Sequence, residues 1–493
     1  MGGLAGVVSL EKKKKNKEKI NLLLDRISHR GKKREIYDIH GNYIGINSNY
    51  ELRNRAGENI ILMDGRIYNL DKLLSKYGIE NSGKNSPDIN KVSSLFNSEG
   101  EKIFEEFQGS FAMALSDADN NLYLMRDVVG GKPLYYLKDD GTLMFASEVK
   151  SLAGISKNIK ELPPGSCMSN FKSPERIKKI RAEDYSVIDN PQPGELEDKL
   201  KEYLLKSFDK RISGRDLAFG VWLSGGLDSS IVAALLKEFS EKVYTYSVGF
   251  ENSPDLLSAR DVAKYLGTNH TEYKLNVEEL FSSIPEVVYS LESFDAPLVR
   301  SSLGNMVVSK ISSSSDMVFS GEGGDELFAG YNYFLDFNSS KLIQKEIVKA
   351  ICELHNTALQ RVDRVANAYG VNVKLPMLDE GLIDFVLEIP PGKKVRKDKN
   401  TGKYILRKMA SSYLPEAITW REKDKFWEGS GIEDTLEKKI EDIMTDEEFE
   451  KERELPGNVM LRNKEEVYYY KIFRKCFSGV NFNNIISLTM DFN

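Results

Sequence analysis

Residues 224–230 read SGGLDSS and combine glycine, hydroxyl and carboxylate side chains directly after an apolar run. Paired glycines let backbone N–H groups approach an anion closely, and serine hydroxyls add donors, so phosphate is the expected ligand. A carboxylate beside phosphate is repelled unless a cation lies between them, and Mg²⁺ is the simplest cation to place next to Asp228. No lysine follows the glycines, which argues against the GxxxxGK[ST] loop of kinases and GTPases.

A second stretch, residues 320–326, reads SGEGGDE and holds three carboxylates within five residues. Acids this close repel one another unless a cation is bound or a proton is shared. The two stretches together predict cation-assisted chemistry on a phosphate compound.

The elements that must position these stretches alternate in type. Residues 217–222 have the length and apolar character of a strand, and 231–236 have helical character. Residues 243–250 then predict a strand, and 259–267 a helix. This alternation is typical of a parallel sheet covered on both faces. Residues 195–212 carry apolar side chains at four-residue steps, which predicts a helix packed on the core.

Composition limits the class of protein. The chain has 493 residues and a net charge of −6, so we expect two domains and no nucleic-acid surface. No apolar run is long enough to cross a membrane and no signal peptide opens the chain, so a cytoplasmic protein is expected. The cysteines are scattered and odd in number, and the histidines form no ligand pattern, which disfavours disulfides and zinc. The cysteines are Cys167, Cys352 and Cys476.

SGGLDSS resembles the pyrophosphate-binding loop of the ATP-pyrophosphatase superfamily, and nearly the whole chain resembles the asparagine synthetase family. The resemblance implies ATP and Mg²⁺, and a reaction in which the aspartate side chain becomes β-aspartyl-AMP before ammonia converts it to asparagine. It implies Asp228 and Asp325 as the magnesium carboxylates, Glu322 as the base for ammonia, and Lys423 as the cation on the α-phosphate. It places aspartate near Asp295 and Arg300. The implied ATP and pyrophosphate contacts are Leu223, Ser224, Gly225, Gly226, Asp228, Ser229, Val248, Gly249, Ser320 and Gly321.

The N-terminal segments resemble an N-terminal-nucleophile glutaminase domain of αββα layers, but the functional residues differ. Gly2 stands where the family has its nucleophilic cysteine. Asp64-Gly65-Arg66 stands where the family has Asn-Gly-Glu, so an acceptor replaces the oxyanion donor and a cation faces the glutamine amine. Asp88 matches a second amine-binding position, and Arg53 and Arg55 are candidates for the carboxylate-binding arginine. The sequence therefore predicts a domain that does not hydrolyse glutamine.

The expected organisation is a glutaminase-like α+β domain over 1–172, a linker over 173–194, an α/β synthetase domain over 195–480 and a tail over 481–493. Ammonia would come from solution or from a separate ammonia-supplying protein, and the resemblance implies a homodimer. Two alternatives stay open. A β-lactam-synthetase-like ligase or cyclase would adenylate another carboxylate, and a regulatory homologue would have lost both activities.

Overall fold

The computed structural model describes residues 2–10, 15–49, 54–80, 86–212, 217–315, 317–421, 431–457, 459–486 and 488–489. The chain forms two compact units. The first comprises residues 1–180 and 477–487, and the second comprises 181–476 and 488–493.

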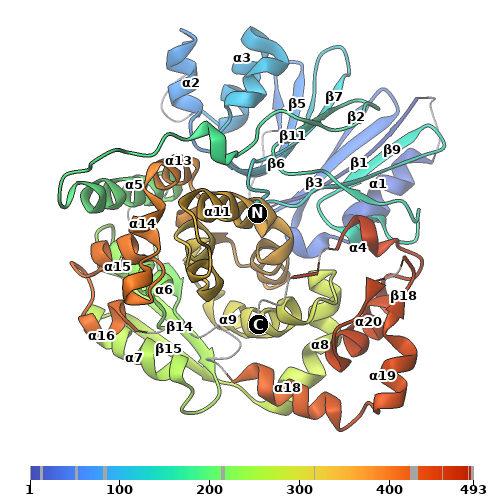
Figure 1. Ribbon diagram of the computed structural model, residues 1–493. Helices are drawn as coiled ribbons and strands as arrows, with labels where there is room; N and C mark the ends of the chain where they lie inside the picture. The colour runs from blue at the N-terminus through green and yellow to red at the C-terminus, as the bar shows by residue number, and fades with distance from the viewer. Residues whose placement is uncertain are drawn as a thin grey trace. The chain divides into compact units, whose positions relative to one another are not determined.

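Two antiparallel sheets, each six-stranded within the described residues, form the centre of the first unit (Figure 1). The first sheet has the order β10 (Lys160–Glu161), β8 (Tyr135–Asp139), β9 (Thr142–Ala146), β1 (Gly2–Ser9), β3 (Asn42–Ser48) and β2 (Lys33–Ile39). The second has the order β12 (Glu175–Arg176), β11 (Ser166–Ser169), β7 (Leu122–Arg126), β6 (Gly109–Ser116), β5 (Asn59–Ile67) and β4 (Arg55–Ala56).

Alternation along the strands builds two cores. Ile60 and Leu62 of β5 point toward the first sheet and pack with Leu4, whereas Ile61 points to the opposite face and packs with Leu73. Helices α2 (Leu70–Lys76) and α3 (Asp88–Glu99) cover that outer face. Helices α1 (Asn16–Asp25) and α4 (Val149–Leu152) cover the first sheet. The predicted αββα layers are therefore confirmed.

A parallel sheet, five-stranded within the described residues, organises the second unit. Its order is β15 (Asn269–Lys274), β14 (Val243–Gly249), β13 (Phe219–Trp222), β16 (Met317–Phe319) and β17 (Val373–Lys374), and every pairing is parallel. From β13 the chain adds strands on one side and then returns to the other side at β16. Open parallel sheets bind ligands at such a switch point, beyond the carboxyl ends of the strands.

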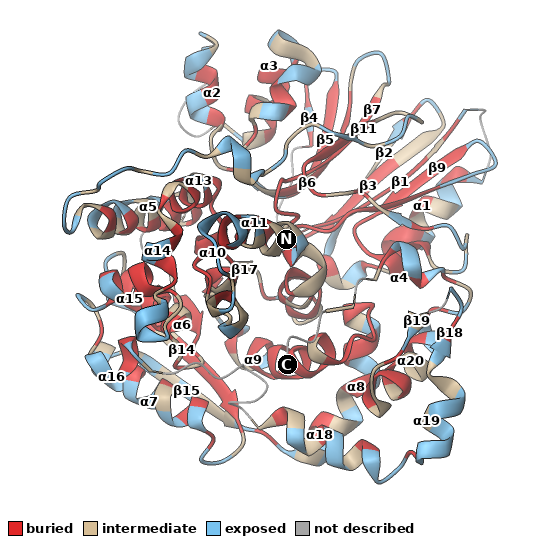
Figure 2. Cartoon of the chain, in the orientation of Figure 1, coloured by how far each residue is buried: buried red, intermediate tan, exposed pale blue. Residues whose placement is uncertain are grey.

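Helices cover both faces of this sheet, as predicted. Trp222 donates from its indole nitrogen to Ser312 of α9 (Ala296–Ser312) at 3.1 Å. Phe319 points the other way and stacks on Phe208 of α5 (Glu195–Arg211). Helices α6 (Leu227–Leu236) and α7 (Pro254–Leu266) lie against β14 (Figure 1), and α6 is almost wholly buried (Figure 2). The buried stripe on α5 confirms the helix expected over 195–212.

The remaining helices surround this centre and complete the second unit. They are α8 (Val277–Leu291), α10 (Gly324–Leu327), α11 (Ser340–Thr357), the π-helical turn Arg361–Val365, α12 (Ala366–Ala368), α13 (Glu380–Glu388), α14 (Pro391–Lys394), α15 (Tyr404–Ala410), α16 (Glu416–Thr419), α18 (Ile432–Glu441), α19 (Asp446–Glu452) and α20 (Lys464–Cys476); a small hairpin pairs β18 (Glu454–Leu455) with β19 (Val459–Met460).

The boundary between the two units falls inside the expected linker, and part of the expected tail groups with the first unit. Residues 175–176 form β12 and so extend a sheet of the first unit. Tyr185 instead donates to Asp384 of α13 at 2.8 Å, within the second unit. The C-terminal residues 477–487 group with the first unit, where the backbone of Asn481 donates to Lys157 at 3.2 Å. Contacts with residues far away in the sequence decide these memberships, and composition does not reveal them.

None of the three cysteines, all of which lie in the described residues, forms a disulfide. Within the part of the chain that the structure describes, no helix is both long and apolar enough to cross a membrane.

Candidate active site

The loop between β13 and α6 has the conformation that its glycines permit. Gly225 has a φ of +74°, and a side chain there would meet the backbone nitrogen of Ala259 at 2.5 Å. Ser224 and Ser229 hydrogen-bond each other through their hydroxyls at 3.1 Å. Helix α6 then begins at Leu227 with Asp228 in its first turn. The strand, glycine turn and helix expected from the sequence are thus confirmed.

The loop after β16 packs directly on the first loop. A Cβ on Gly321 would lie 2.7 Å from the backbone of Asp228, and one on Gly324 would lie 2.6 Å from the Asp228 carboxylate. Only glycine allows this approach. The structure therefore brings the two chemically suggestive stretches together at the switch point between β13 and β16.

Lys403 is the residue of this site that sequence reasoning missed. Its ammonium group contacts the carboxylates of both Asp228 and Asp325, the latter at 2.6 Å, and its side chain is 5% exposed. Burial alone lowers the pKa of Lys403, but the two carboxylates outweigh burial and the net pKa is raised. The sequence held one clue to such a residue, since carboxylates that lie close together require a nearby cation. Lys403 follows Gly402 at the start of α15.

The three acids of 320–326 are each stabilised in a different way. Asp325 contacts Lys403. Glu322 pairs with Arg361 at 2.7 Å. Glu326 accepts a hydrogen bond from Tyr331 at 2.6 Å, and burial, with the charges of Asp325 and Glu322, raises the pKa of Glu326 to about 7. The expectation that such close acids need cations or a shared proton is confirmed.

The residues expected beside the adenine lie at the ends of two neighbouring strands. Leu223 follows β13 and its backbone donates to Tyr246 of β14 at 2.9 Å. Val248 and Gly249 end β14, and both Leu223 and Val248 are buried. A side chain on Gly249 would lie 2.5 Å from the Ser253 hydroxyl. Ser320 follows β16, the other neighbour of β13. Their contacts with ATP stay predictions.

Lys423 lies outside the described residues, so its role also stays a prediction. Arg421 is described and approaches the first loop. Its guanidinium donates to the carbonyl of Gly225 at 3.4 Å and pairs with Asp255 at 3.2 Å.

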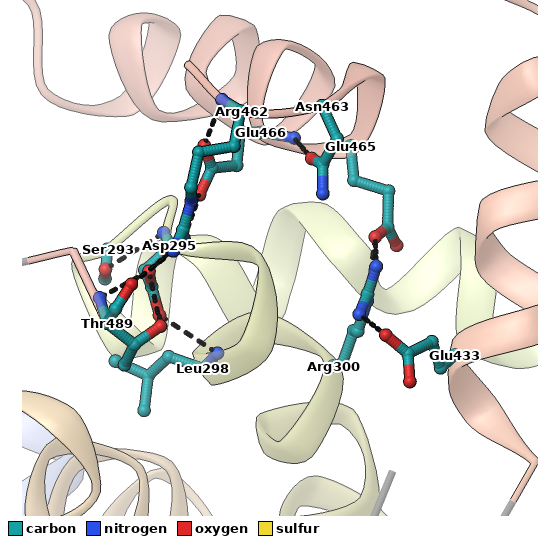
Figure 3. A network of polar contacts seen from close by, with 10 residues as sticks. All are labelled: Ser293, Asp295, Leu298, Arg300, Glu433, Arg462, Asn463, Glu465, Glu466 and Thr489. Atoms are coloured by element: carbon teal, nitrogen blue, oxygen red, sulfur yellow. Dashed lines mark hydrogen bonds and ion pairs between the residues drawn. The ribbon is translucent and has the colours of Figure 1, made fainter. Parts of the chain in front are cut away.

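Asp295 and Arg300, expected to bind the substrate, are both engaged by protein partners (Figure 3). Asp295 pairs with Arg462 at 2.8 Å and accepts hydrogen bonds from Thr489. Arg300 pairs with Glu433 and Glu465. Burial raises the pKa of Asp295 to about 6, although Arg462 opposes this rise. Both charges are therefore paired within the protein, and the contact of Asp295 and Arg300 with a substrate stays a prediction.

In the first unit, Gly2 and Asp64 lie together in a fully buried ionic network. One Asp64 oxygen accepts a hydrogen bond from the Gly2 backbone nitrogen at 2.8 Å, and the other pairs with Arg30 at 2.9 Å. Arg30 also pairs with Glu148 at 2.6 Å. Burial opposes ionisation of Glu148, but Lys150, His29 and Arg30 together hold its pKa well below the usual value.

The other residues of the expected degenerate pocket lie nearby in the fold. Gly65 has a φ of +103°, and a Cβ there would collide with the backbone of Ser110. Arg66 pairs with Asp88 at 3.3 Å, with both side chains partly exposed. Arg55 is exposed on β4, and Arg53 lies outside the described residues.

Two antiparallel sheets between helices form a glutamine-amidotransferase-type domain, and a parallel α/β unit with glycine loops at its switch point follows it in the chain. The family model "Asparagine synthase" matches residues 199–345 and 336–481, and "Glutamine amidotransferase domain" matches 50–154.

Relatives from distant organisms match over most of the chain. Asparagine synthetase B [glutamine-hydrolyzing] of Escherichia coli K12 is 32% identical, covering 86% of this chain and 80% of the relative. The probable asparagine synthetase [glutamine-hydrolyzing] of Dictyostelium discoideum is 31% identical, covering 97% and 94%. The rat asparagine synthetase [glutamine-hydrolyzing] is 33% identical, covering 84% and 81%. This chain belongs to the asparagine synthetase family.

Proposed function

We propose that this chain is an AMP-forming amide ligase that adenylates the side-chain carboxylate of aspartate and transfers ammonia to it, without using glutamine. The adenylation step is supported by one observation: the second glycine loop packs against Asp228 of the first, and the carboxylates of Asp228 and Asp325 both contact the buried ammonium group of Lys403. The relatives named as asparagine synthetases support the choice of ATP and aspartate as substrates.

The residues present suit a magnesium ion. Two carboxylates that both reach one ammonium nitrogen can also share one small cation. Within the described chain no cluster of three or more His, Cys, Asp or Glu side chains suits a metal, but Mg²⁺ commonly uses one or two carboxylates and takes its other ligands from phosphates and water. Asp228 and Asp325 would hold it, and the ion would neutralise charge on the leaving pyrophosphate.

The chain's own residues account for the remaining chemistry. Backbone N–H groups of the first loop and the start of α6 face an anion and orient the phosphates. Lys403 adds positive charge to this pocket, and Lys423 stabilises the α-phosphate as the aspartate oxygen attacks it. Once AMP has activated the acyl carbon, Glu322 takes a proton from the attacking ammonia.

Pyrophosphate release tests this proposal. Purified protein with ATP and Mg²⁺ should release pyrophosphate with aspartate, less with glutamate or β-amino acids, and should form asparagine only when ammonium is added. Pyrophosphate release with another carboxylic acid but not with aspartate would contradict the assignment of aspartate as the substrate and would favour the β-lactam-synthetase-like alternative. No release with any acid would favour the regulatory alternative. The proposed homodimer and ammonia-supplying partner are checked by light scattering and by co-purification.

The ionic network in the first unit supports the absence of glutamine hydrolysis. Gly2 has no side chain to attack an amide. The Asp64 carboxylate accepts a hydrogen bond from the Gly2 backbone nitrogen at 2.8 Å, so an acceptor stands where a developing oxyanion would need a donor.

A cysteine at position 2 is therefore expected to restore no glutaminase activity by itself. A Cβ at Gly2 would lie 3.0 Å from the end of the Ile46 side chain and 3.5 Å from the carbonyl oxygen of Asn47, so a small shift of Ile46 would accommodate this carbon. Asp64 would still face the oxyanion and Arg66 the glutamine amine. Glutamate release should be undetectable in wild type and in Gly2→Cys, and should first become measurable when Asp64→Asn and Arg66→Glu are added. Glutamate release by the wild type would show that the domain is active.

A further inference from the structure

Arg361 forms the only ion pair that Glu322 makes with a described residue. Its guanidinium lies 2.7 Å from Oε2 of Glu322, and the two side chains are 15% and 14% exposed. The other oxygen of Glu322, Oε1, accepts no hydrogen bond from any described residue. One oxygen is thus held, while the second has no partner among the described residues and the side chain stays partly exposed to solvent.

The backbone at Arg361 is unusual. Residues Arg361–Val365 form a π-helical turn between Gln360 and α12. Such turns are rare and are frequent at functional sites, because the extra residue rotates a side chain out of the regular helical register. Here the turn begins at the arginine that faces the proposed base.

Asn305 is a third residue of this arrangement and contacts Arg361. The side-chain oxygen of Asn305, on α9, accepts a hydrogen bond from Arg361 at 3.4 Å. Asn305 is buried, and its amide nitrogen has no partner among the described residues. A buried unpaired donor is unfavourable, so this asparagine is not explained by folding alone. Asn305, Arg361 and Glu322 form a chain of contacts that ends at the proposed base.

We propose that Arg361 is a positioning residue for the amide-forming step. It fixes Oε2 of Glu322, which leaves Oε1 to take the proton that ammonia loses as its nitrogen bonds to the acyl carbon and AMP departs. This inference rests on the proposed function and deepens it, because it names what orients the base. It also explains why an arginine is needed, since its planar fork can bind Glu322 and Asn305 together.

A double-mutant cycle tests this inference with four proteins: wild type, Glu322→Gln, Arg361→Met and the double variant. Loss of a general base typically costs ~10²–10⁴ in rate, and we expect at least a ~10-fold loss of asparagine formation for Arg361→Met. If Arg361 acts through Glu322, the double variant should be no more than about threefold slower than Glu322→Gln, since residues that work as a unit are not additive. Arg361→Lys should recover part of the kcat.

Further readouts separate positioning from a structural role. Arg361→Met should raise the ratio of pyrophosphate released to asparagine formed, while the KM for ATP stays within about twofold. Arg260→Met is the matched control, because Arg260 pairs with Glu272 on the exposed side of α7 and should leave every rate unchanged. Thermal melting of each variant reports folding.

The outcomes are distinguishable. Wild-type activity together with losses that multiply in the double variant would overturn this inference and leave the proposed function intact. The same holds if Arg361→Met keeps the wild-type kcat. A wild type that releases no pyrophosphate with any carboxylic acid would overturn the proposed function, and this inference with it. If the wild type acts on an acid other than aspartate, the same four proteins are compared with that acid as the substrate, and the same two outcomes decide.

Discussion

Asp228→Asn is expected to lower the rate of aspartate-dependent pyrophosphate release by ~10²–10³-fold, the usual cost of losing one strong transition-state contact. Asparagine keeps the shape of the side chain, so Gly321 and Gly324 can still pack against it. Only the negative charge that would hold Mg²⁺ beside the phosphates is lost. Initial rates at saturating ATP, aspartate and Mg²⁺ measure the effect, and Asp325→Asn should give a loss of similar size.

The fold should survive both substitutions. Each variant leaves Lys403 with one of its two carboxylates, so the buried ammonium keeps a partner. Asp261→Asn, on the exposed side of α7, is the matched control and should be fully active. If Asp228→Asn melts like the wild type and retains full activity, Asp228 holds no catalytic cation and the proposed metal site is wrong.

Local sequence patterns predicted the individual strands and helices of this protein better than they predicted which strands pair and which residues contact one another. The strand, glycine turn and helix at 219–236 follow from an apolar run, two glycines and an apolar helix, all adjacent in sequence. The strand order of the parallel sheet was not predicted, because it depends on which faces pack after the chain has crossed the sheet.

The sites show the same limit. Lys403 reaches Asp228 across 175 residues, and no local pattern connects them. The family resemblance placed a substrate near Asp295 and Arg300, and that role stays a prediction. In the structure their charges are paired with residues more than 130 positions away, Arg462 and Glu433 among them, which no local pattern indicates. The family resemblance predicted the αββα layers, but the pairing of Arg30 with Asp64 and Glu148 became apparent only in three dimensions.

Arg30→Met should lower the free energy of unfolding of the first unit by ~3–5 kcal/mol, because removing one partner of a buried ion pair leaves an uncompensated charge. Arg30 is 0% exposed, and so are the carboxylates of Asp64 and Glu148 that it joins. Arg34→Met is a matched control four residues away. Arg34 is 31% exposed and pairs with the exposed Asp25, so its removal should cost only ~0–1 kcal/mol. Calorimetry of the full chain compares the two variants.

The same network should make the first unit sensitive to acid. The pKa of Glu148 is lowered in the folded chain, so the folded state binds fewer protons than the unfolded state. Its stabilising contribution is complete above the ordinary glutamate pKa and is lost as pH falls below it. Arg30→Met should weaken this dependence, because Glu148 then keeps only His29 and Lys150. Equal, small effects of Arg30→Met and Arg34→Met at neutral pH, with unchanged acid sensitivity, would mean that the buried guanidinium does not stabilise these carboxylates.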